Sequence, residues 1–142
     1  MCVAALFAGA CKSNCESSKG PDLRAELSDT RWEPVFVKDL GKAKAPDPSK
    51  GDDPVFLRFS KDLSVNGMSG DNLFGGNPEI SPDGAFSGGN FFSTRRAGPF
   101  GEYEAKFLKA LGEADKIELS GASLKFYKGT ELLLEFKKSQ KE

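Results

Sequence analysis

The stretch VNGMSGDNLFGG, residues 65–76, could bind an ion or a phosphate, because it combines four glycines with Asp71 and Asn72. A phosphate-binding glycine loop leads from a strand into a helix, whose free amides meet the anion. Here a turn and another β-type run follow instead. A calcium loop needs oxygen ligands at alternating positions, and Asp71, Asn72, Asn77 and Glu79 do not keep that spacing. We therefore expect the glycines to serve turns, with neither a metal nor a cofactor bound.

Two pairs of carboxylates are candidates for general acid–base catalysis, namely Asp62 with Asp71 and Glu102 with Glu104. Acidic residues in turns and at helix starts are more often caps or solvated charges. The sequence contains no histidine, which removes the commonest general base and the usual partner of a nucleophilic serine or cysteine. The sequence therefore predicts a protein that is not an enzyme and has no catalytic residue.

Charge and length narrow the function further. The 142 residues suit one domain with a substantial core. Twenty basic and 21 acidic side chains leave a net charge of −1 and a pI near 5.6. A nearly neutral chain has no overall field that attracts a phosphate backbone, so we expect no nucleic-acid partner.

All three cysteines lie near the N-terminus, at positions 2, 11 and 15. An apolar run over residues 1–10 is too short to span a bilayer, which takes about 20 apolar residues, but it suits the hydrophobic region of a signal peptide. The segment LFAGAC resembles a bacterial lipoprotein box and predicts lipidation of Cys11. A short buried helix or strand is the alternative for residues 1–10. The polar residues 11–26 would then form a flexible tether between the lipid and a folded body.

The rest of the chain alternates apolar and polar residues in short runs. Residues 27–40 predict a strand with Trp32 and Phe36 on one face and a bulge or sheet edge at Pro34. Residues 41–53 predict a mobile loop, because their composition cannot pack. Residues 54–65 predict a hairpin, and further strands are expected up to residue 98 and over residues 115–138.

One segment predicts an α-helix, over residues 101–112. Its apolar residues fall on one side, Glu102 and Glu104 lie in its first turn, and Gly112 is placed to form a left-handed cap. With the strands, this gives a mainly β (α+β) fold, an antiparallel barrel of about eight strands with one α-helix after the fifth strand. The twelve phenylalanines either fill such a barrel or line a cavity for one small ligand.

The order of five segments resembles the META domain family, also called HslJ-like after a heat-inducible bacterial envelope protein. The segments are SDTRWEPV, VNGMSGDNLFGG, FFSTRRAGP, EAKFLKAL and ASLKFYKGTELLLEF, and the resemblance covers residues 27–138. The positions that match the family pattern are Trp32, Gly67, Gly70, Asn72, Phe74, Gly76, Thr94, Arg95 and Glu104.

Two positions depart from the family pattern. Relatives commonly carry cysteine where this chain has Asp71, and again where it has Gly98. Both cysteines are missing together, as expected if the two positions interact in relatives. A redox role for that pair is therefore not expected here.

The resemblance implies a compact, lipocalin-like module, frequently carried on secreted or lipid-anchored bacterial proteins, linked to heat shock and to novobiocin tolerance, and without established catalysis. Together with Cys11 it predicts a non-catalytic envelope lipoprotein, facing the periplasm and anchored to a bacterial membrane, that acts as a stress-response or binding module. The alternative is a carrier of a small apolar ligand. We expect a monomer whose partners are the membrane and either an envelope protein or such a ligand.

Overall fold

The computed structural model describes residues 22–88 and 91–139. Cys11 and the predicted signal segment, residues 1–10, lie outside them. The predicted tether, residues 11–26, is wrong at its C-terminal end, because Leu23–Leu27 forms helix α2. The Asp22 carboxylate caps this helix by accepting a hydrogen bond from the backbone N–H of Arg24. Leu27 is fully buried, so the folded body begins before the residue predicted from the sequence.

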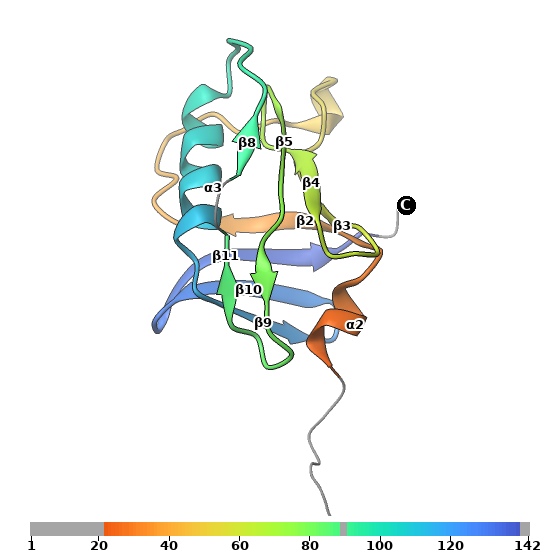
Figure 1. Cartoon of the computed structure of the whole chain (residues 1–142). Helices are drawn as coiled ribbons and strands as arrows, with labels where there is room; N and C mark the ends of the chain where they lie inside the picture. The colour runs from red at the N-terminus through yellow and green to blue at the C-terminus, as the bar shows by residue number, and fades with distance from the viewer. Residues whose placement is uncertain (1–21, 89–90, 140–142) are drawn as a thin grey trace, which may run out of the picture.

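Eight strands form one antiparallel sheet (Figure 1). Each strand pairs with its neighbours in an order that places β2, the first strand of the described residues, near the middle. From one edge to the other the strands are β8 (Phe92–Ser93), β5 (Leu73–Gly76), β4 (Val65–Met68), β3 (Phe56–Phe59), β2 (Thr30–Val37), β11 (Glu131–Lys138), β10 (Ser123–Lys128) and β9 (Lys116–Ser120).

The sheet curves strongly but does not close into the predicted barrel. In Figure 1, β4 and β5 run steeply across the direction of β2, β11, β10 and β9. The edge strands β8 and β9 are not paired with each other; β6 (Glu79–Ile80) and β7 (Phe86–Ser87) form a separate ribbon, which an Ala85–Lys116 bridge joins to β9. The segment between β5 and α3 is rich in glycine and proline, which interrupt strands, so its strands are too short to complete a barrel.

A bulge in β2 makes the predicted orientation of its side chains wrong beyond Pro34. In the pairing with β11, Pro34 lies opposite Phe136 and Phe36 lies opposite Glu135, so Val35 is an extra residue. The extra residue reverses the alternation beyond it. Trp32 is buried as predicted, but Phe36 is 43% exposed and Val37 is buried in its place.

The predicted helix is present as α3 (Gly101–Glu113). It follows the short strand β8 rather than a fifth full strand. Gly112 is inside the helix instead of capping it, and the extended C-cap is Ala114. No helix within residues 22–88 and 91–139, the short 3-10 helix η2 (Pro48–Lys50) included, is long and apolar enough to cross a membrane.

Aromatic rings fill the space between α3 and the sheet. Phe107 of α3 packs edge-on against Phe74 of β5, with ring centroids 5.5 Å apart, and against Phe136 of β11 at 6.1 Å. Phe126 continues the contact from Phe136 to Phe86 of the β6–β7 ribbon. Edge-to-face pairs of this kind stabilise by about 0.5–1.5 kcal/mol beyond the area they bury. The rings occupy the region where a lipocalin-like barrel would hold a ligand.

Gly67→Ala is expected to destabilise the protein by at least about 2 kcal/mol, because overpacking of a core is costly. An added Cβ at Gly67 would lie 2.1 Å from the carbonyl oxygen of Phe56, on the neighbouring strand β3, and 2.9 Å from the ring of Phe74. Denaturant unfolding monitored by Trp32 fluorescence measures the change.

Gly112→Ala is the matched control for this prediction. Nothing lies within 4 Å of a Cβ added at Gly112, and alanine is favoured over glycine inside a helix by about 0.5–1 kcal/mol. It should therefore stabilise the protein. Equal effects of the two substitutions would show that the contact between Gly67 and β3 is not what requires glycine there.

Candidate functional site

The glycine stretch forms the hairpin of β4 and β5. The prediction that its glycines serve turns is right for Gly70 but wrong for Gly67, Gly75 and Gly76, which lie within the strands. The Ser69 backbone N–H donates a 2.9 Å hydrogen bond to the Asn72 carbonyl across the turn. Gly70 lies between them at φ 145°, a conformation that side chains rarely adopt. Ser69 and Asn72 are both buried, so the turn is part of the interior.

Glu104 of α3 holds this turn. Its carboxylate accepts hydrogen bonds from the Ser69 hydroxyl at 2.8 Å, the Asn72 backbone N–H at 2.9 Å and the Asn72 side-chain amide at 2.8 Å. Hydrogen bonds to a charged group contribute about 1.5–3 kcal/mol each. The carboxylate considered for catalysis is thus saturated with structural donors.

Asn72 extends the network to the segment that precedes α3. Its side-chain oxygen accepts from the Thr94 hydroxyl at 2.8 Å and from the Arg96 backbone N–H at 2.7 Å. Its amide also donates to the Arg96 carbonyl at 3.0 Å. Asn72, Thr94 and Glu104, which lie far apart in sequence, are therefore brought together, and we name Ser69, Asn72, Thr94 and Glu104 the turn network.

The positions that depart from the family pattern lie against each other. A Cβ added at Gly98 would be 2.3 Å from Cγ of Asp71. The Asp71 carboxylate also accepts a 2.9 Å hydrogen bond from the backbone N–H of Phe100. A side chain at position 98 and a carboxylate at position 71 cannot coexist in this arrangement, so the two departures depend on each other.

The other motif residues are dispersed. Phe74 is buried in the aromatic core, and Trp32 is buried on β2, where its indole N–H donates to the Thr30 hydroxyl. Gly76 ends β5. Arg95 is exposed, and the network uses the backbone of Arg96 rather than the Arg95 side chain.

Neither candidate pair of carboxylates is assembled. Asp62 and Asp71 lie at opposite ends of β4, and the Asp62 carboxylate accepts from the backbone and hydroxyl of Ser64, which lowers its pKa. Glu102 is exposed on α3, two residues from Glu104 and therefore on another side of the helix. Residues 22–88 and 91–139 contain no group of acidic, cysteine or histidine side chains arranged for a metal.

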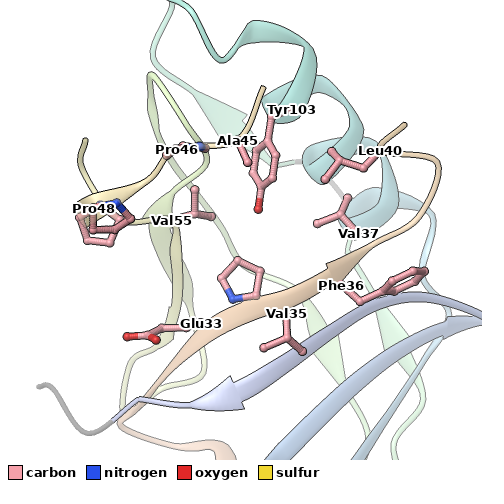
Figure 2. A pocket seen from close by; sticks show the side chains of 12 residues that line it. Glu33, Val35, Phe36, Val37, Leu40, Ala45, Pro46, Pro48, Val55 and Tyr103 are labelled. Carbon is pink, nitrogen blue, oxygen red and sulfur yellow. The ribbon is translucent and has the colours of Figure 1, made fainter. Parts of the chain in front are cut away.

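A groove of about 580 Å³ lies beside the second half of β2 (Figure 2). The neighbouring strand β3 pairs with β2 only over Thr30–Trp32, so the loop before β3 and the start of α3 form the opposite walls. We call this the β2 groove. Its lining is largely apolar and consists of Glu33, Pro34, Val35, Phe36, Val37, Leu40, Ala45, Pro46, Pro48, Pro54, Val55 and Tyr103.

Tyr103 is the polar group in the wall of the β2 groove that α3 contributes. It is only 5% exposed, and its burial raises the pKa of the phenol to about 12. Figure 2 shows its hydroxyl pointing into the space between Val37 and Val55. The sequence pattern predicted an apolar side of this helix but gave no separate role to Tyr103. The sequence did not predict that Val35 and Phe36 are exposed. It indicated a bulge or sheet edge at Pro34, but not the reversal of side-chain orientation that a bulge causes.

Glu104→Ala is expected to lower the free energy of unfolding by about 2–4 kcal/mol, since it leaves the buried donors of Ser69 and Asn72 without their acceptor. Chemical denaturation measures this. Glu102→Ala, in the same helical turn but exposed, is the control and should change stability by less than about 0.5 kcal/mol. Similar losses in both variants would contradict the assigned role of Glu104.

The double variant Asp71→Cys/Gly98→Cys is expected to form a disulfide, because a Cβ at position 98 would lie beside the position that the sulfur of residue 71 takes. Closing the intervening loop should raise the unfolding free energy of the oxidised form above that of the reduced form by about 3 kcal/mol. Non-reducing mass spectrometry and denaturation with and without reductant test this. Asp71→Cys alone should show no redox dependence, and two free thiols in the double variant would refute the proximity.

The fold and motif agree with comparisons to known proteins. The model of the META domain family matches residues 25–141. The chain is similar to the NMR structure of a protein from Burkholderia xenovorans, with 25% identity and a TM-score of 0.64 over 91% of this chain and 97% of that one. A second NMR structure, at 20% identity and a TM-score of 0.61 over 80% of this chain and 92% of that one, supports the fold alone. No curated protein matches the sequence. The chain belongs to the META domain family.

Proposed function

We propose that this protein is a non-catalytic META-domain lipoprotein of the bacterial cell envelope, and that its domain is a binding module that acts through the β2 groove. Binding and stress response were the two roles expected from the family. The observation that favours binding is the β2 groove, which is largely apolar and has a volume of about 580 Å³. This volume is typical of sites for small molecules.

The polar residues of the family motif support a non-catalytic role. A catalytic acid or base needs a group that a substrate can reach and whose pKa is tuned to its task. The carboxylate of Glu104 instead accepts hydrogen bonds from Ser69 and Asn72, which belong to the fold. The motif residues therefore stabilise the fold, and we assign the binding function to the β2 groove.

The proposal includes a lipid anchor at Cys11. Lipidation there would hold the domain on a bacterial membrane, facing the periplasm, as a monomer on a polar tether. The bacterial modification adds three acyl chains, and burial contributes about 0.8 kcal/mol per CH₂ group, so the attachment would be firm.

A carrier of a small apolar ligand is the second candidate. It was expected to use the interior of a barrel, but the sheet is open, and rings of Phe74, Phe107 and Phe136 fill the space between it and α3. The observation that favours a carrier is again the β2 groove, which lies outside this core and is lined by proline, valine and phenylalanine side chains.

Cys11→Ser is expected to abolish the incorporation of radiolabelled palmitate when the full chain is produced in a bacterium, because the thiol that receives the lipid is lost. The protein should move from the membrane fraction to the soluble fraction. Cys15→Ser removes the neighbouring thiol and should leave labelling unchanged. A wild-type product that is soluble and retains residues 1–10 would refute the anchor.

A further inference from the structure

The Tyr103 hydroxyl gives the β2 groove a specific chemistry. Tyr103 is 5% exposed, and the described residues supply no hydrogen-bond partner to its hydroxyl, whose oxygen is not among the fully buried unpaired atoms. Its ring packs against Phe107, at 6.3 Å between centroids, so it is held in place. The hydroxyl oxygen is open to the groove, where a ligand can reach it. A hydrogen bond that it donates to a ligand contributes about 0.5–1.5 kcal/mol.

We propose that the β2 groove binds a compact, uncharged and largely apolar molecule that carries one hydrogen-bond acceptor, such as a carbonyl oxygen, to which the Tyr103 hydroxyl donates. This inference rests on the proposed binding function and names the class of its ligand. An ordinary phenol, with a pKa near 10, already keeps its proton at neutral pH, so the hydroxyl is a donor there.

Charge in the lining excludes ionic ligands. Glu33 is the charged residue among the groove's lining residues, and it would repel an anion. It is also engaged, since its carboxylate accepts a 3.2 Å hydrogen bond from the Ser139 hydroxyl and lies 4.0 Å from the Lys137 ammonium. A cation would have to compete with Lys137 and Ser139 for the Glu33 carboxylate. The other lining residues of the groove are uncharged, so they suit a neutral ligand.

The edge of β2 argues against an extended peptide. A peptide that adds to a sheet edge needs consecutive backbone N–H and C=O groups on that edge. Beyond Trp32 the open part of β2 begins with Glu33 and Pro34, and proline has no N–H. The bulge at Val35 also breaks the ladder, and both devices are typical of edges protected from strand addition.

The proline-rich wall of the groove can adjust to such a ligand. In the described chain, the hydrogen bonds of residues 42–54 stay within residues 40–54, for example from Lys50 N–H to the Asp47 carbonyl at 2.9 Å and from Ala43 N–H to the Leu40 carbonyl at 3.0 Å. Lys44 adds a cation–π contact with Phe100 at 5.6 Å. Because no hydrogen bond ties this wall to the sheet, it can shift without breaking one.

The test compares two probes of the same shape, 2-acetylnaphthalene and 2-isopropenylnaphthalene, in which a CH₂ group replaces the carbonyl oxygen. Their affinities for the intact full chain are measured by ligand-observed NMR. Tyr103→Phe removes the hydroxyl and keeps the ring. We expect the preference for the ketone, taken as the ratio of the two affinities, to fall about fivefold in this variant, as expected for one hydrogen bond.

Ala45→Trp fills the β2 groove from its loop and should abolish binding of both probes. Ala105→Trp, on the exposed side of α3, is its control and should bind both as the wild type does. If Ala45→Trp abolishes binding but the affinity ratio is the same in wild type and Tyr103→Phe, the groove binds but the proposed ligand class is wrong. If neither probe binds, or Ala45→Trp has no effect, the binding role of the groove fails as well. Lipidation of Cys11 is unaffected by either result.

Discussion

The rest of the structure depends on the hydrogen bonds that the Glu104 carboxylate accepts from the β4–β5 turn. The sheet is open and β8 has only two residues, so strand pairing alone does not fix this end of the molecule. The turn network joins three segments that are distant in sequence: the turn, residues 94–96 and α3. A charged group with three donors is a strong link in a partly buried site.

Two functional consequences follow from the position of α3. One face of the helix carries Phe107 into the aromatic core. An earlier turn of the same helix carries Tyr103 over the β2 groove. The turn network therefore sets the geometry of the groove although none of its members lines it. This separates the residues that define the family motif from those that would contact a ligand.

Much of the fold could be predicted from local pattern. Alternation over residues 54–65 predicted a hairpin, and β3 and β4 pair as one, with Val55, Leu57 and Phe59 buried. The pattern could not show whether the sheet closes into a barrel. Closure depends on whether the two edge strands pair, and no single segment of the sequence decides that. Nor could it show that Val35 would be the extra residue of the bulge, which depends on the pairing with β11. Gly112 was misplaced because a glycine inside a helix is tolerated when neighbouring turns pack well.

The presence of Asp71 and Gly98, rather than two cysteines, bears on the redox conditions under which the domain can fold. Asp71 joins its turn to the start of α3 through a hydrogen bond to the Phe100 amide, where relatives commonly carry cysteines. All three cysteines of this chain precede residue 16. The folded body therefore contains no thiol whose oxidation state must be set. Its assembly is independent of the redox potential of the compartment and of the enzymes that catalyse disulfide formation.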